Sequence, residues 1–194
     1  MILVRHGRTA ANAQGLLQGR TDLSLDGVGH EQARVVAAAI GAVDEVISSS
    51  LRRARETAAY FDAPSSIDDR WIELDFGEYD GYSLAAVPAE VWNGWRSDAD
   101  FTPVGGESMR TLDVRVRAAC TDVIERARST NVVVVSHVSP IKAAVAWAFG
   151  GDITMSWRIH LDQAAVCRIG SGAGKPVLRS FNEVLYGPTV AGFG

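Results

Sequence analysis

Short apolar runs alternate along this chain with longer segments in which apolar residues recur at helical spacing. Residues 1–4 form the first run, and residues 132–135 form a continuous valine run that is typical of a central strand buried on both faces. Residues 29–40 are rich in alanine, and residues 107–127 repeat apolar side chains every three or four positions. This alternation of strands and helices predicts an α/β fold with a parallel sheet.

The remaining segments continue the same pattern. Pro64 ends the second long helix, and the glycine-rich residues 170–174 predict the turn of a hairpin. Beyond the elements already given, we expect strands at residues 43–47, around Ile67, at 164–169 and at 177–181, and helices at 51–61, 84–96 and 139–149.

The length and composition of the chain suit one hydrophobic core rather than two. The chain has 194 residues, of which 47% are hydrophobic, and this predicts a single domain over residues 1–194. The first strand leaves no room for a leader ahead of it, and no apolar run approaches the roughly 20 residues that cross a bilayer. We therefore expect a cytoplasmic protein without a membrane segment. Cys120 and Cys167 lack the spacing of a zinc or disulfide motif and are expected to be buried thiols.

The net charge of -4 argues against a broad nucleic-acid or membrane surface, because such surfaces are usually basic. An anionic ligand would therefore need a local cationic pocket. The sequence does not determine the oligomeric state, and a homodimer is one of the open alternatives. Several arginines lie close to the motifs described next, at Arg5, Arg8, Arg20, Arg52, Arg53 and Arg55.

Two apolar strands each end on a histidine, His6 and His137. If these strands are neighbours, both imidazoles lie at the carboxyl edge of the sheet, where open α/β folds bind ligands. Around His6, an imidazole can attack phosphorus, the guanidinium of Arg5 can neutralise phosphate oxygens, and Gly7 permits close backbone approach. The alternatives are structural histidines or a metal site, and the metal site lacks a supporting aspartate or an HxH spacing.

Five motifs in order resemble the histidine phosphatase superfamily, in its phosphoglycerate mutase-like branch, and the last is similar to α-ribazole phosphatase-like proteins. The resemblance covers nearly the whole chain and implies a three-layer α/β sandwich whose mostly parallel central sheet is flanked by helices. The motifs are RHGRT at 5–9 with Asn12 and QGRTDLSLDG at 18–27, SSSLRRARETA at 48–58, ELDFGEYDG at 73–81, GGES at 105–108 and VVVVSHVSPIK at 132–142.

The same resemblance assigns catalytic roles to five residues. It implies that His6 is the nucleophile that becomes phosphohistidine and that Glu73 is the general acid. Arg5, Arg53 and His137 would hold the phosphoryl oxygens. The resemblance implies no metal and no cofactor, because these three side chains supply the positive charge.

Substrate contacts are implied at Asn12, Gln18, Gly19 and Val138. Many relatives have glycine where this chain has Val138, so the backbone contact beside the second histidine is expected to differ. Arg8 stands where glutamine or glutamate is frequent, and its charge favours substrates with a second anionic group.

The function implied by the resemblance is hydrolysis of a small-molecule phosphate ester. A cofactor-dependent phosphoglycerate mutase is the alternative, but such mutases resemble longer chains, and only residues 82–104 separate the glutamate and GGES motifs here. A noncatalytic phosphate-binding module is a second alternative, although no catalytic residue of the motif set is missing.

Overall fold

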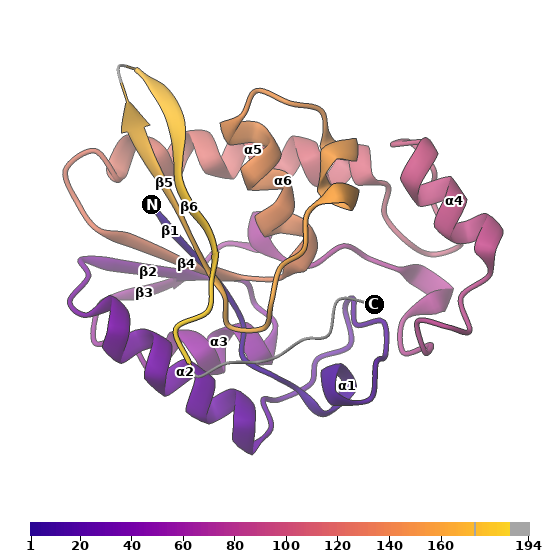
Figure 1. Ribbon diagram of the computed structural model, residues 1–194, viewed down its shortest axis with the longest axis horizontal. Coiled ribbons are helices and arrows are strands. Elements are labelled where there is room, and N and C mark those ends of the chain that lie inside the picture. The colour runs from indigo at the N-terminus through magenta and orange to yellow at the C-terminus, as the bar shows by residue number, and fades with distance from the viewer. Residues whose placement is uncertain (173, 187–194) are drawn as a thin grey trace.

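The computed structural model describes residues 1–172 and 174–186, and these residues form a six-stranded sheet in the order β3-β2-β4-β1-β5-β6 (Figure 1). Parallel pairing joins β3 to β2, β2 to β4 and β4 to β1. The predicted mostly parallel sheet is therefore confirmed. The bounds of these four strands are β1 (Ile2–Arg5), β2 (Glu45–Ser48), β3 (Ser65–Ile67) and β4 (Val132–Ser136).

The two C-terminal strands are antiparallel. β5 (Val166–Gly172) pairs with β1 on one side and with β6 (Lys175–Glu183) on the other. The predicted hairpin is confirmed, but its turn is shorter than residues 170–174, because the ladder continues to the pair Gly172 and Lys175. Ala173, within the predicted turn, lies outside the described residues.

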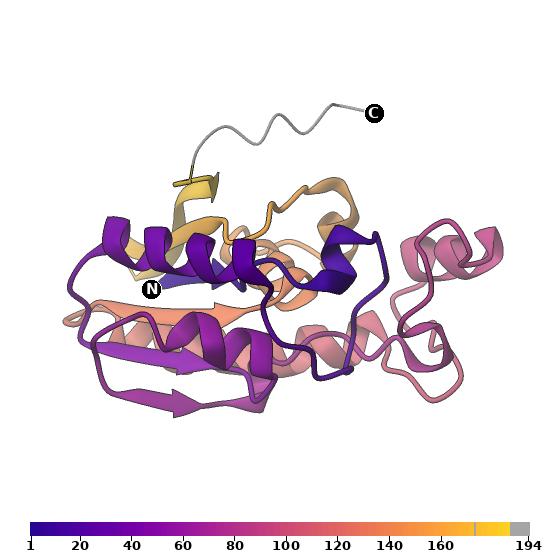
Figure 2. The ribbon, with the colours of Figure 1, turned by 90° about the horizontal axis from the view of Figure 1, so that it is seen from below.

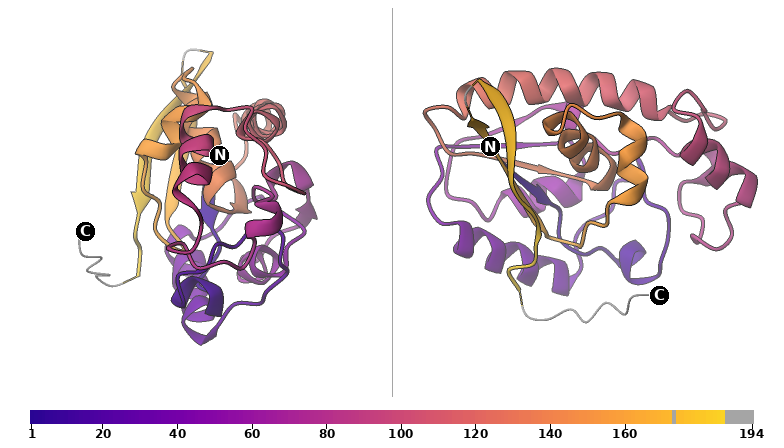
Figure 3. Two further views of the ribbon diagram at one scale, coloured as in Figure 1. Left: turned by 90° about the vertical axis from the view of Figure 1, so that its right-hand side faces the viewer. Right: turned by 45° about the horizontal axis from the view of Figure 1, so that its top comes forward.

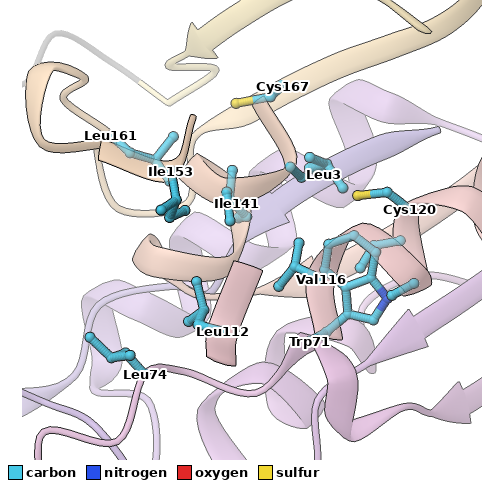
Figure 4. Packing of buried hydrophobic residues seen from close by; sticks show 14 of the residues in the cluster. Leu3, Trp71, Leu74, Leu112, Val116, Cys120, Ile141, Ile153, Leu161 and Cys167 are labelled. Carbon is cyan, nitrogen blue, oxygen red and sulfur yellow. The ribbon is translucent and has the colours of Figure 1, made fainter. Parts of the chain in front are cut away.

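Helices cover both faces of the sheet, which confirms the three layers (Figures 1 and 2). Successive residues of a strand point to opposite faces, so Leu3 packs with α5 and α6 while Val4 packs with α2 and α3. Figure 4 shows Leu3 together with Leu112, Val116 and Ile141 in the first of these layers. The helices are α2 (Gly27–Ile40), α3 (Arg52–Ala58), α5 (Met109–Arg126) and α6 (Val138–Ala148).

Three helices differ from the sequence prediction, and one of them, α3, ends at Ala58 rather than at the expected residue 61. α4 (Ala89–Ser97) begins after the expected residue 84, because Ala86 N–H closes a turn on the Ser83 carbonyl and Pro88 occupies the N-cap position. It lies beyond one end of α5, outside the layers of the sheet (Figure 3). A short helix, α1 (Ala10–Ala13), follows β1, where the sequence analysis predicted no helix. Its cause is local, because Thr9 and Asn12 form a capping box.

Three 3-10 helices complete the elements of the described residues: η1 (Asp69–Trp71), η2 (Gly77–Tyr79) and η3 (Ile153–Arg158). Both cysteines are buried free thiols, as expected, and burial raises the pKa of Cys167 to about 11. In the described part of the chain, no helix combines the length and the apolar character needed to cross a membrane.

Candidate active site

The two histidines predicted to meet do lie side by side. β1 and β4 are parallel neighbours with Arg5 opposite Ser136, so both strands deliver their next residue to the same edge. The backbone N–H of His6 donates to the Ser136 carbonyl at 2.9 Å. As a result the imidazole centroids of His6 and His137 are 5.1 Å apart.

One ring nitrogen of His6 is hydrogen-bonded, and the other has no hydrogen-bond partner among the described residues. Nδ1 lies 2.7 Å from the carbonyl oxygen of Gly7. A carbonyl only accepts, so Nδ1 carries the proton and Nε2 keeps its lone pair. Burial, followed by the charges of Arg53 and Arg5, holds the pKa of His6 well below its ordinary value. His6 is therefore a neutral base at neutral pH.

His137 is fully buried behind this group. Its Nε2 lies 2.6 Å from Ser49 Oγ, while Nδ1 has no partner among the described residues. Burial, Arg53 and His6 together keep the pKa of His137 well below its ordinary value. It is therefore neutral in the described structure.

Two buried guanidinium groups supply the positive charge of the site. Arg5 donates from Nη1 to the Leu161 carbonyl at 2.7 Å, and Arg53 donates to the carbonyls of Thr21 and Gly19 at 2.9 and 2.7 Å. The Nε atoms of both arginines are buried and have no partner in the described part of the chain. Burial lowers the pKa of Arg53 to about 10, so both side chains remain cationic at neutral pH. These unpaired N–H groups suit an anion.

The carboxylate of Glu73 is held at the start of α6. Its Oε2 accepts from the Val138 amide at 3.0 Å, and its Oε1 accepts from the amides of Ser139 at 3.1 Å and Leu74 at 2.7 Å. The first amides of a helix have no partner within the helix and carry partial positive charge. α6 thus places a buried carboxylate beside the two histidines.

Arg115 of α5 fixes the backbone that carries Glu73. Its guanidinium donates to the carbonyls of Ile72 at 2.7 Å and Glu73 at 3.2 Å, and also to that of Arg70. The same guanidinium is paired with Glu107 of the GGES motif at 2.8 and 2.9 Å. The sequence analysis missed Arg115 because it lies in none of the five motifs.

The loop around Gly19 is held by carboxylate and guanidinium contacts. Asp80 accepts from the amides of Gly19, Arg20 and Thr21 at 2.8 to 2.9 Å. Because the Gly19 carbonyl already accepts from Arg53, both backbone polar groups of Gly19 are engaged within the protein.

Thr57 and Ser49 are two site residues that the sequence analysis did not single out. The Thr57 hydroxyl accepts from the Gly7 amide at 3.1 Å and donates to the Arg53 carbonyl at 2.8 Å. Ser49 contacts His137 as described above. Both lie within the motif at residues 48–58 that supplies Arg53, so their place in that motif was the available signal.

These groups border a cavity of about 430 Å³. Six of the nine predicted site residues line it: Arg5, His6, Asn12, Gln18, Glu73 and Val138. The other three, Arg53, His137 and Gly19, are not among its lining residues, and Arg53 and His137 are fully buried. Among the described residues, no group of three or more histidine, cysteine, aspartate or glutamate side chains is arranged to hold a metal.

Comparison with curated proteins finds relatives that match most of this chain. A bifunctional protein of Mycobacterium tuberculosis is 33% identical over 176 residues, which cover 86% of this chain and 48% of the relative. The chain thus spans about half the length of the first curated relatives it matches. A protein named "Probable phosphoglycerate mutase GpmB" from Enterobacter sp. is 33% identical over 86% of this chain and 82% of its own length.

The fold is also similar to solved structures. A phosphoserine phosphatase from Entamoeba histolytica, crystallised with 3-phosphoglyceric acid, superimposes with a TM-score of 0.85 at 29% identity and covers 94% of this chain and 95% of its own. The family model described as histidine phosphatase superfamily (branch 1) matches residues 1–184. With this match over nearly all of the sequence and the paired histidines at the sheet edge, the chain belongs to the histidine phosphatase superfamily.

Proposed function

We propose that this protein hydrolyses a phosphomonoester of a small metabolite through a phosphohistidine at His6. One observation carries the proposal: His6 is neutral, its Nδ1 proton is held by Gly7, and its Nε2 is free in a cavity bordered by Arg5 and Glu73. A free imidazole nitrogen beside fixed positive charge is the arrangement that attack on an anionic phosphate needs.

In the first step, His6 Nε2 attacks phosphorus and the bond from phosphorus to the ester oxygen breaks. The protonated form of Glu73 donates its proton to the departing oxygen, and an alcohol leaves. The hydrogen bond from Nδ1 to Gly7 orients the imidazole and stabilises the positive charge that develops on the ring. The guanidinium groups of Arg5 and Arg53 stabilise charge on the phosphoryl oxygens.

In the second step, water attacks the phosphorus of phosphohistidine. The carboxylate of Glu73 accepts a proton from that water as the bond from His6 Nε2 to phosphorus breaks, and inorganic phosphate leaves. Glu73 therefore returns to its protonated form and His6 to its neutral form, so the cycle closes without a metal or cofactor.

The role of His137 is to bind a phosphoryl oxygen from its unpaired Nδ1 when that nitrogen carries the proton. Ser49 fixes the other nitrogen, which holds the ring orientation. Asn12, Gln18 and the Val138 backbone are proposed as substrate contacts at the cavity wall. The engaged backbone of Gly19 supports a role for that residue through Arg53 rather than through direct contact.

The relatives support a small phosphorylated metabolite as substrate, since one is a phosphoserine phosphatase bound to 3-phosphoglyceric acid. A phosphoglycerate mutase is the second candidate, and the mutase name of one relative favours it. The short segment of residues 82–104 argues for the phosphatase, because it leaves less protein to shield a bound intermediate from water.

The test is hydrolysis of p-nitrophenyl phosphate in the presence of a chelator. We expect turnover by the wild type, none by His6→Ala and greatly slowed turnover by Glu73→Gln, with folding of each variant checked by circular dichroism. An inert wild type across a panel of phosphate esters would indicate the noncatalytic binding module. Fast isomerisation of 3-phosphoglycerate that depends on 2,3-bisphosphoglycerate would indicate the mutase.

The setting of the protein is also a proposal. Buried free thiols support a cytoplasmic protein, and an acidic net charge supports one that binds no nucleic acid. The length of 194 residues and the hydrophobic content of 47% support one domain over residues 1–194. A single cooperative urea transition checks the one-domain proposal. Sedimentation velocity distinguishes a monomer from a homodimer.

A further inference from the structure

The cavity extends beyond the reacting groups into a wall that the proposed chemistry does not use. Its volume of about 430 Å³ lies within the range of roughly 300–1,000 Å³ that holds drug-sized ligands. The far wall is largely apolar, with Leu16, Leu84, Trp92, Met109 and Trp157. A phosphate bound at His6 would therefore leave room for an apolar organic group of considerable size.

One cation in this wall has no partner. Lys142 lies three residues after Ser139 and four after Val138 on α6, so the three side chains share one helix face, and all line the cavity. Lys142 makes no hydrogen bond or ion pair within the described ranges. Burial, followed by the charge of Arg5, lowers the pKa of its ammonium group, and the charge of Glu73, which forms no ion pair with Lys142, opposes this shift. A partly desolvated ammonium without a counterion is costly unless an anion pairs with it.

The unpaired polar atoms of the cavity wall are donors. Ser156 is 3% exposed, and its hydroxyl has no partner among the described residues. The same holds for Trp157 Nε1 and Gln18 Nε2. Ser156 and Trp157 lie on η3, which packs against α6, the helix that carries Lys142. All three atoms are buried, so they lie within the wall and do not face the open cavity.

Arg8, which the sequence suggested for a second anionic group, does not occupy this place. Its Nε is paired with Asp26 at 2.8 Å, and the side chain does not line the cavity. The sequence analysis placed the charge at Arg8 because this residue, within the motif at residues 5–9, stands where glutamine or glutamate is frequent. The structure places the unpaired charge on α6 instead.

We propose that Lys142 binds a carboxylate carried by the organic part of the substrate, and that an apolar or aromatic body joins this carboxylate to the phosphate. This inference rests on the proposed hydrolase function and adds the class of its substrate. A carboxylate is assigned rather than a second phosphate because one ammonium group balances a single negative charge.

A matched set of benzyl phosphates tests the proposal. 4-Carboxybenzyl phosphate and 4-carbamoylbenzyl phosphate have the same size and nearly the same leaving group, and only the first carries a carboxylate. We expect the wild type to prefer the carboxylate. In Lys142→Met the ratio of the two kcat/KM values should fall about tenfold to a hundredfold, the range of a charged hydrogen bond. Lys142→Arg, which keeps the charge, should retain most of the preference.

Other outcomes overturn parts of this assignment while the hydrolase stands. If Lys142→Met lowered kcat/KM equally for both substrates and left their ratio unchanged, Lys142 would contact the transferred phosphoryl group instead. If the wild type strongly preferred a benzyl phosphate whose ring carries a second phosphate at position 4, the group bound by Lys142 would be a second phosphate and not a carboxylate. Faster turnover of 3-phosphoglycerate than of 4-carboxybenzyl phosphate would contradict the apolar body. No hydrolysis of any ester by the wild type would instead refute the proposed function itself.

Discussion

The backbone at the start of α2 lies directly against the loop that carries the nucleophile, and a single methyl group tests this contact. A Cβ atom added at Gly29 would lie 2.0 Å from the carbonyl oxygen of Arg8 and 2.7 Å from its amide nitrogen. Both neighbours are backbone atoms, so no side-chain rotation relieves the clash. Gly29→Ala therefore forces the two segments apart, and His6 lies only two residues before Arg8.

The size of the effect follows from the distance. Contacts of Cβ shorter than 3.0 Å are essentially never found, so the two backbones must separate by about 1 Å. Overpacking of this kind costs about 1–3 kcal/mol in the free energy of unfolding. Displacement of a reacting group by about 1 Å lowers activity by about a hundredfold. We expect both losses in Gly29→Ala.

Gly27→Ala is the matched control, because Gly27 lies in the same first turn of α2 and a Cβ there meets nothing within 4 Å. It should leave kcat/KM unchanged and stabilise the helix by up to about 1 kcal/mol. The assays are urea unfolding and hydrolysis of p-nitrophenyl phosphate. Equal stability and activity in the two variants would refute the close packing of α2 against the loop after β1.

Two further perturbations test the site. Arg115→Met should lower kcat by about tenfold to a hundredfold, because the carbonyls of residues 70, 72 and 73 lose their donor; Arg115→Lys should not restore the fork-shaped contacts. The exposed Arg128→Met is its control, and full activity in Arg115→Met would contradict the positioning role. Stability should also fall as pH drops below about 6.5, the ordinary histidine value, because buried His6 and His137 stay neutral in the folded protein while they protonate in the unfolded chain. Each histidine contributes up to about 1.4 kcal/mol per pH unit to the slope of the free energy of unfolding against pH. His6→Asn should therefore reduce this slope between about pH 6.5 and 5, as measured by urea unfolding. An unchanged slope would contradict this prediction.

The sequence predicted the sheet better than the helix ends. Strands β1 and β4 are continuous apolar runs, which are stable only when buried, so the bounds predicted for them were nearly correct. α4 was predicted too long because the apolar residues of the preceding turn continue a helical spacing, whereas backbone bonding and Pro88 decide where the helix starts.

For the site, the sequence predicted that His6 and His137 would meet if their strands were neighbours, and the parallel pairing of β1 with β4 supplies that condition. It did not reveal Arg115 or Lys142, which reach the site from α5 and α6. A helical arginine or lysine usually faces solvent, and only the packing of the helices shows which one points inward. The difference between Arg5, which lines the cavity, and Arg53, which is buried on the carbonyl of Gly19, likewise depends on tertiary contacts.

The most direct measurement of the central claim is to trap the intermediate. Wild-type protein is mixed with a ³²P-labelled phosphomonoester, quenched in base within milliseconds, digested and mapped by mass spectrometry. The account predicts up to one phosphoryl group per chain, stable in base and labile in acid, attached to His6 and accumulating in Glu73→Gln if the second step is slowed more than the first. Hydrolysis without label on His6, or turnover by His6→Ala at the wild-type rate, would contradict it.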